Sequence, residues 1–203
     1  MKIYSRQSGE VTHVESYPCT VVTEYRGEVF ISSRRSSEET VKVYKYDMNS
    51  KRSEMLFSFP QKSNLAYFLS VSAQYIAVID KDNENIKLYN RRSASVSTKQ
   101  LSGLKVVQNL LFLPDGCLLV TGNDNVKVMT NKYSIVSEEE PVLIWSCDQV
   151  PSAYGVSEDE RGLIYVSGAK NKTLSVLSAE GKYNTKKITI SLLLLFWFDY
   201  DRS

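Results

Sequence analysis

The tetrapeptide Val41-Lys42-Val43-Tyr44 is one of five related phrases in this chain. Apolar residues alternate with other residues within it, which is the period-two pattern of a β-strand. The phrases start about 40 to 48 residues apart, and this is the period of four-stranded propeller blades. The other copies are Met1-Lys2-Ile3-Tyr4, Ile86-Lys87-Leu88-Tyr89, Val126-Lys127-Val128-Met129 and, more loosely, Leu174-Ser175-Val176-Leu177.

A second repeated marker precedes four of these phrases. It is a short apolar run rich in β-branched and aromatic residues, as expected for a strand that is buried on both faces. Turn-forming residues stand in front of it, such as Pro114-Asp115-Gly116. The four copies align without gaps: Gly27–Ser32, Gln74–Ile79, Gly116–Thr121 and Gly162–Ser167.

Together the two markers predict an all-β propeller of about four to four and a half blades, open or truncated. Each blade reads as strand, turn, strand, polar loop, strand, turn and strand. Because the first phrase includes Met1, the chain is expected to begin inside a blade. The predicted boundaries are 1–16 for the end of an incomplete blade, blades at 17–60, 61–102, 103–148 and 149–190, and an apolar tail at 191–203.

The composition favours a cytoplasmic globular protein. In 203 residues, 25 basic and 23 acidic side chains leave a net charge of +2, so bulk attraction to nucleic acid or to a membrane gains no support. Cys19, Cys117 and Cys147 are widely spaced and odd in number, which favours reduced thiols. The apolar run at 188–198 is shorter than the roughly 20 residues of a membrane helix, so no membrane partner is expected.

The fourth unit, Val150–Gly168, resembles an NHL repeat. It has Pro151, the pair Gly155-Val156, an acidic turn that ends at Gly162 and the strand Ile164-Tyr165-Val166. The third unit, 113–126, is similar, whereas the first two lack the proline and the Gly-Val pair. The resemblance implies an NHL-like propeller, a fold that usually closes with six blades.

Such propellers often form the C-terminal part of tripartite-motif (TRIM) ubiquitin ligases. The resemblance therefore implies a platform that binds protein partners, including ubiquitination substrates, and in some members RNA. Ligase activity does not carry over, because His13 is the only histidine and cannot complete a zinc-binding RING array with three scattered cysteines. A second copy could also complete the ring by self-association.

Neither catalysis nor metal binding is predicted. His13 has no motif around it, and the acidic residues lie in turns without the spacing of calcium ligands. We therefore expect a non-enzymatic protein with no catalytic residue, no metal site and no cofactor. Two alternatives remain open at this point: an RNA-binding propeller, and a metal-dependent propeller hydrolase or lactonase.

The expected partner-binding face consists of the polar loops between the second and third strands of each blade. Loops held by a rigid scaffold are where recognition concentrates. Arg91 and Arg92 follow a third strand and are expected on the opposite face. The face is predicted to contain Arg34, Arg35, Lys81, Asp82, Asn83, Asn123, Asp124, Asn125, Lys170, Asn171 and Lys172.

Overall fold

The computed structural model contains only strands and their connections in the part of the chain that it describes. This part comprises residues 2–4, 11–13, 19–34, 39–61, 68–80, 82, 84–136, 139–168 and 172–189. Four antiparallel sheets of four strands follow one another along the chain, preceded by a two-stranded hairpin. The prediction of an all-β propeller with about four blades is confirmed.

The hairpin and the sheets have the following strands. The hairpin pairs β1 (Lys2–Tyr4) with β2 (Val11–His13). Blade 1 contains β3 (Cys19–Tyr25), β4 (Glu28–Ser33), β5 (Thr40–Asp47) and β6 (Arg52–Pro60). Blade 2 contains β7 (Leu69–Val71), β8 (Tyr75–Asp80), β9 (Asn85–Asn90) and β10 (Ser95–Lys99). Blade 3 contains β11 (Val106–Phe112), β12 (Leu118–Asn123), β13 (Val128–Ser134) and β14 (Val142–Cys147). Blade 4 contains β15 (Ala153–Glu158), β16 (Ile164–Gly168), β17 (Thr173–Leu177) and β18 (Tyr183–Thr189).

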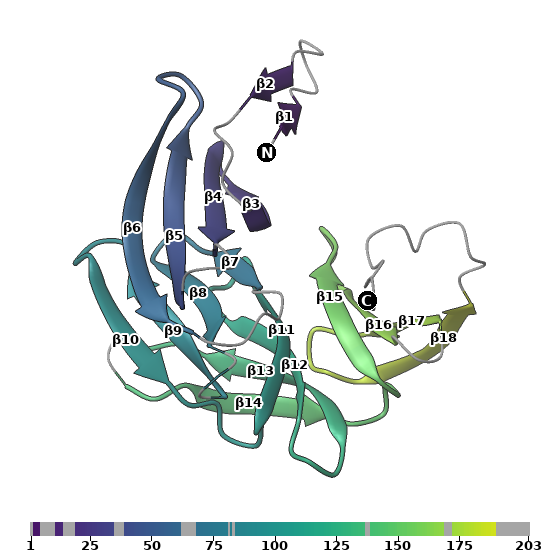
Figure 1. Cartoon of the computed structure of the whole chain (residues 1–203). Coiled ribbons are helices and arrows are strands. Elements are labelled where there is room, and N and C mark those ends of the chain that lie inside the picture. Colours follow the sequence, from purple (N-terminus) through teal and green to yellow (C-terminus); the bar gives the residue numbers. More distant parts are fainter. Residues whose placement is uncertain are drawn as a thin grey trace, which may run out of the picture.

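The four blades lie side by side in an arc (Figure 1). Within each blade the strands pair in chain order, and successive blades contact each other mainly through their first strands. The first strands therefore lie nearest the centre of the arc, and the fourth strands form its rim. The part of the chain described shows no helix that is long and apolar enough to cross a membrane.

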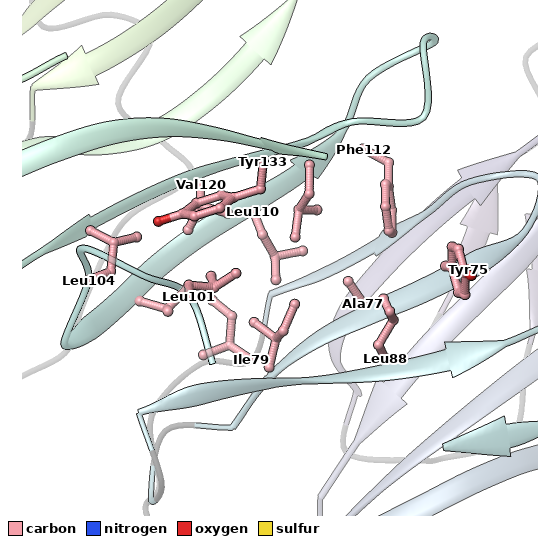
Figure 2. Close-up of a cluster of buried hydrophobic side chains, with 13 residues drawn as sticks. Tyr75, Ala77, Ile79, Leu88, Leu101, Leu104, Leu110, Phe112, Val120 and Tyr133 are labelled. Atoms are coloured by element: carbon pink, nitrogen blue, oxygen red, sulfur yellow. The ribbon is translucent and has the colours of Figure 1, made fainter. Parts of the chain in front are cut away.

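The blades are held together by apolar side chains that alternate along the second strands. In β8, Ile76 and Val78 pack toward blade 1, whereas Ala77 and Ile79 pack toward blade 3 (Figure 2). Every residue of β8 is buried, which confirms the prediction of a strand covered on both faces. Each fully buried Val, Leu or Ile contributes about 1.5–3 kcal/mol, so the burial of these side chains between neighbouring blades stabilises the stack.

One predicted strand was wrong at its beginning. The phrase Val126-Lys127-Val128-Met129 was read as a strand, but β13 starts only at Val128, and Val126 is 86% exposed. Asp124 closes the preceding turn by accepting hydrogen bonds from the backbone N–H groups of Val126 (2.8 Å) and Lys127 (2.7 Å). The side-chain hydrogen bonds of an Asx turn therefore take the place of strand pairing here.

Candidate functional site

The connections between strands fall into two groups at opposite ends of the blades. The turns from the first to the second strand and from the third to the fourth strand lie at one end, because the strands are antiparallel. The connections from the second to the third strand, together with those that lead to the next blade, lie at the other. The partner-binding face predicted from the sequence is at this second end.

At that end, the structure places five of the predicted residues in the connections between second and third strands and a sixth, Asn123, at the end of β12. Arg34 follows β4, Asp82 and Lys172 lie in later connections, and Asp124 and Asn125 follow Asn123. Arg35, Lys81, Asn83, Lys170 and Asn171 lie outside the described residues.

Two of these side chains are used locally by the protein itself. The side chain of Asn123 accepts a hydrogen bond from the backbone N–H of Asn125 at 3.1 Å. The carboxylate of Asp124 accepts the two backbone bonds described above, and hydrogen bonds from Lys127 and Val126 lower its pKa. Both residues therefore stabilise the turn, which leaves the exposed side chains of Val126 and Asn125 to face solvent.

The opposite end contains a hollow of about 700 Å³ between three consecutive blades, which we call the turn hollow. Its walls are the turns that follow the first strands of blades 1, 2 and 3. This volume lies in the range of small-molecule sites, roughly 300–1,000 Å³. The lining residues are Thr23–Arg26, Ser70–Tyr75, Leu111–Cys117, Ser134 and Ile135.

The blade 1 wall ends in a tight hairpin at Arg26 and Gly27. Both residues have positive φ, 52° and 80°, as in the two-residue turns that fit the twist of a hairpin. Arg26 occupies a left-handed conformation that costs a residue with a Cβ about 1–2 kcal/mol. Its guanidinium carbon lies 5.4 Å from the centre of the Tyr25 ring. Among the described residues it forms no ion pair, and it is one of the residues that line the hollow.

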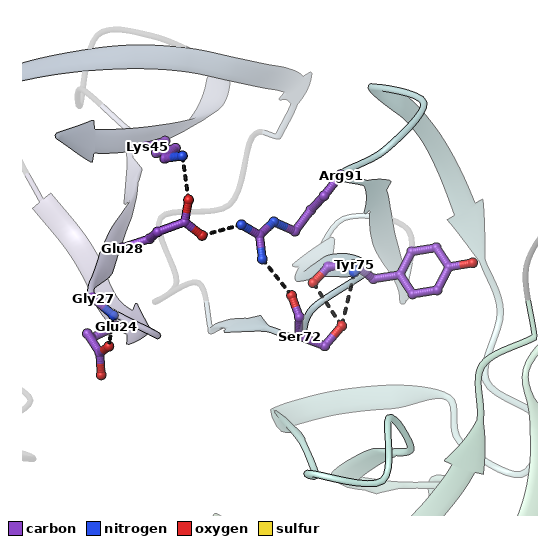
Figure 3. Close-up of polar contacts among 7 residues, drawn as sticks. All are labelled: Glu24, Gly27, Glu28, Lys45, Ser72, Tyr75 and Arg91. Atoms are coloured by element: carbon purple, nitrogen blue, oxygen red, sulfur yellow. Dashed lines mark hydrogen bonds and ion pairs between the residues drawn. The ribbon is translucent and has the colours of Figure 1, made fainter.

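Arg91, which follows β9, connects the walls of blades 1 and 2. Its guanidinium donates to the carboxylate of Glu28 in β4 and, at 2.9 Å, to the backbone oxygen of Ser72 (Figure 3). Lys45 also pairs with Glu28, and this hydrogen bond, followed by those from Arg91, lowers the pKa of Glu28. The guanidinium of Arg91 also lies over the rings of Phe30 (5.2 Å) and Tyr25 (5.6 Å). The position of the Arg26 hairpin relative to the Ser72 turn is therefore fixed by charge-assisted hydrogen bonds.

The blade 2 wall is a turn closed by its own serine. The hydroxyl of Ser72 accepts a hydrogen bond from the backbone N–H of Tyr75 at 3.0 Å and donates to the backbone oxygen of Tyr75 at 3.2 Å. The side chain of Gln74 donates to the hydroxyl of Tyr75 at 3.1 Å, at the edge of the hollow. Ser70 joins this wall to blade 3, because its hydroxyl accepts a bond from the N–H of Phe112 at 2.8 Å.

The blade 3 wall contains a paired carboxylate and a thiol. Asp115 forms an ion pair with Lys132 at 2.7 Å and accepts a hydrogen bond from the N–H of Cys117 at 2.9 Å. Burial acts to raise the pKa of Asp115, but the bonds from Lys132 and Cys117 outweigh it and the pKa is lowered. Burial, reinforced by the negative charge of Asp115, raises the pKa of Cys117. The thiol is therefore protonated at neutral pH and is a poor nucleophile.

These walls supply the chemistry of a binding site. Donors come from Arg26 and Gln74, acceptors from Glu24 and Asp115, and apolar surface from residues such as Phe112 and Ile135. Among the residues that the structure describes, no group of three or more His, Cys, Asp or Glu side chains is placed to hold a metal ion. The arrangement can bind and orient a polar organic molecule.

Sequence reasoning did not identify the turn hollow. Pro114 and Gly116 were read as turn formers and Gly27 as the first residue of an apolar run. No sequence pattern pairs Arg91 with Glu28, which lies 63 residues earlier. The sequence did indicate the end of the blades at which Arg91 lies. Arg91 follows a third strand, so it belongs at the end opposite the predicted face.

Comparisons with known proteins support the propeller fold. No protein-family model matches the chain, and no curated protein matches it by sequence. Solved structures do match. A Lactobacillus plantarum protein aligns with 94% of this chain and 61% of its own length, at a TM-score of 0.67 and 9% identity. A protein provisionally assigned as a gluconolactonase aligns over 92% of this chain and 69% of its own, with a TM-score of 0.64 and 14% identity. Virginiamycin B lyase from Staphylococcus aureus, with quinupristin, aligns over 95% of this chain and 60% of its own, with a TM-score of 0.61 and 8% identity.

These structural neighbours correct the expectation about enzyme activity, and they limit the expectation about the family to the propeller fold. The prediction that the protein is not an enzyme is contradicted, because the propellers that align with it include a lyase and a provisionally assigned lactonase. The likeness establishes a β-propeller, while a specific similarity to TRIM–NHL propellers is not shown. The chain spans 48% of the first neighbour and 61% of the second, so it corresponds to part of those propellers.

Proposed function

We propose that this chain is a propeller segment that binds a small organic molecule in the turn hollow. The observation that carries the proposal is the hollow itself, about 700 Å³ between the turns of three consecutive blades. Its walls are joined by the hydrogen bond that Arg91 donates to Ser72 and by the one that Ser70 accepts from Phe112, so the site is formed before a ligand arrives. A pre-formed concave site with a few oriented polar groups is typical of small-molecule binding.

The names of the structural neighbours support this class of ligand. One is described as an auxiliary nutrient binding protein from Bacteroides ovatus, one as a provisional gluconolactonase, and one as a lyase with quinupristin. The last two descriptions name small organic molecules, a gluconolactone and quinupristin. If the protein is an enzyme, we propose that it acts as a lactonase or lyase on a ligand bound in the turn hollow.

The test is a binding screen with a variant that fills the hollow. Gluconolactone and quinupristin are the first ligands, measured by titration calorimetry and by turnover assays. Ser134→Trp places an indole in the hollow, and Ser146→Trp places the same side chain at an exposed position on the outer strand of the same blade. Binding that Ser134→Trp removes and Ser146→Trp retains supports the proposal. Binding that Ser134→Trp leaves unchanged contradicts it.

A second candidate function is the protein-recognition platform implied by the resemblance to TRIM–NHL propellers. It would use the opposite end, where Val126 is 86% exposed in the loop between β12 and β13. An apolar side chain at a loop tip beside polar residues is typical of a protein contact. Val126→Asp and Lys172→Glu should then abolish capture of a partner that Arg26→Gln still binds. Equal capture by all three variants would count against this platform.

A further inference from the structure

We propose that the turn hollow binds its ligand through a single carboxylate group, and that Arg26 is the residue that holds this group. The inference rests on the proposed function, because it names the chemical class of ligand for the same site. It follows from the charges in the walls rather than from the volume of the hollow.

Arg26 is the cation among the lining residues, and no ion pair with a described residue occupies its guanidinium. Two nearby cations are already paired. Arg91 is bound to Glu28 and to Ser72, and Lys132 is bound to Asp115 at 2.7 Å. Arg26 contacts only the Tyr25 ring through its guanidinium, at 5.4 Å, among the residues described. A guanidinium on an aromatic ring keeps its edge free, and this edge matches the two oxygens of a carboxylate.

The other charges favour a monoanion over a dianion. Glu24, two residues before Arg26, and Asp115 also line the hollow. The carboxylate of Glu24 accepts a hydrogen bond from the N–H of Gly27 at 2.5 Å, and the lowered pKa of Asp115 keeps that group ionised. Both carboxylates repel any anion, and they would repel a phosphate dianion more strongly than a carboxylate monoanion. Lys132 offsets the charge of Asp115, so a single negative charge leaves the smaller repulsion for Arg26 to outweigh.

The rest of the hollow suits an apolar or aromatic body. Phe112 and Leu113 are buried residues of its lining, and Ile135 lines it as well. A ligand with a carboxylate at one end and a hydrocarbon or aromatic group at the other therefore fits both parts of the site.

The experiment compares hydrocinnamate with its neutral amide, hydrocinnamamide, by ligand-observed NMR titration of the whole chain. The acid should bind the wild type more tightly than the amide, and more tightly than phenyl phosphate. Arg26→Gln should weaken binding of the acid about 10- to 100-fold and leave the amide unaffected, because a hydrogen bond to a charged group is lost. Arg26→Lys should give an intermediate affinity, since the positive charge remains but the planar guanidinium, which can donate to both carboxylate oxygens, is lost.

Arg92→Gln is the matched control, because Arg92 is exposed on the next turn and does not line the hollow. Equal binding of acid and amide, both blocked by Ser134→Trp, overturns the carboxylate inference and leaves binding in the hollow intact. Absence of hydrocinnamate binding at millimolar concentration also overturns it. If hydrocinnamate binds but Ser134→Trp has no effect, the proposed site is itself wrong.

Discussion

The guanidinium of Arg91 donates a hydrogen bond to the carboxylate of Glu28 across the boundary between the first two blades (Figure 3). Both side chains are partly buried, with 20% and 31% of their surface exposed. A pair in this position is screened less by solvent than a surface pair. Glu28 lies directly after the Arg26 hairpin, and Ser72, which accepts the second hydrogen bond of Arg91, lies in the turn of blade 2. The pair therefore links two walls of the turn hollow.

Loss of Arg91 should therefore destabilise the fold. We expect Arg91→Ala to lower the free energy of unfolding by about 1–3 kcal/mol, because a charged hydrogen bond and ring contacts disappear. Arg92→Ala, at the exposed neighbouring position, should change it by less than about 0.5 kcal/mol. Urea unfolding measures both. A double-mutant cycle with Glu28→Gln should show a coupling energy, and additive losses would contradict the pairing.

The same pair predicts a dependence of stability on acid. The hydrogen bonds from Lys45 and Arg91 hold the pKa of Glu28 below its usual 4.5. Its contribution is therefore fully present above pH 4.5 and is lost as the pH falls through the lowered pKa of the folded state. The difference in stability between wild type and Glu28→Gln should shrink as the pH falls below 4.5, because protonation of Glu28 removes its bonds to Lys45 and Arg91 as charged partners. A difference that stays constant over this range would disagree with the assignment.

Gly181 should be intolerant of a side chain. Its φ is 75°, and a Cβ at this position would lie 2.5 Å from the indole of Trp145. The indole is held in place, because its N–H donates to the backbone oxygen of Ala179 at 3.1 Å. We expect Gly181→Ala to cost at least about 2 kcal/mol from backbone strain and steric overlap together.

Gly116 provides the comparison for that substitution. It has a similar φ of 82°, but a Cβ there would meet nothing within 4 Å. Gly116→Ala should therefore cost only the backbone term, about 1 kcal/mol. Thermal unfolding of the two variants separates the terms, and equal losses would show that Trp145 can move aside.

Alkaline conditions should weaken the contact between blades 2 and 3 at Tyr133. Burial raises the pKa of this phenol to about 12, although a hydrogen bond from Asn131 acts in the opposite direction. The phenol also donates to the backbone oxygen of Ser102 at 2.7 Å. Since only the neutral form fits, stability is present below pH 10 and is lost as the pH rises toward 12.

Tyr133→Phe tests that expectation. The variant should be less stable at neutral pH by about 1–2 kcal/mol, because two hydrogen-bonding groups lose their partner. Its disadvantage should diminish between pH 10 and 12, measured by chemical unfolding at each pH. A constant disadvantage would mean that another group titrates.

The blades could be predicted because their apolar periods recur, but the alignment of the third strands could not. In the structure, Ile31 pairs with Tyr44, Val78 with Lys87 and Val120 with Asn131. In the repeated phrases, Tyr44 corresponds instead to Tyr89 and to Met129. Tyr89 lies two residues after Lys87, and Met129 lies two residues before Asn131. A shift of two residues returns each side chain to the same face of the sheet, so the hydrophobic pattern does not change.

The predicted partner-binding face lies at the end opposite the turn hollow, and there is a physical reason why the sequence pointed to that end. Asn123 and Asp124 are polar residues in a loop, and polarity alone does not distinguish a binding side chain from one that closes its own turn. Whether the predicted end binds a protein stays a prediction.

By itself, the sequence determined that four successive β-sheets form and that they stack through apolar second strands. The reason is that apolar residues alternate every two residues within a strand, and that the strands recur about every 40 to 48 residues. Only the tertiary structure decided which turns enclose the hollow and which cation there keeps its donors available. Arg91 and Lys132 are neutralised by Glu28 and Asp115 from elsewhere in the chain, whereas Arg26 forms no ion pair with any residue that the structure describes. Such pairing depends on distances in space, and a local pattern of residues does not contain them.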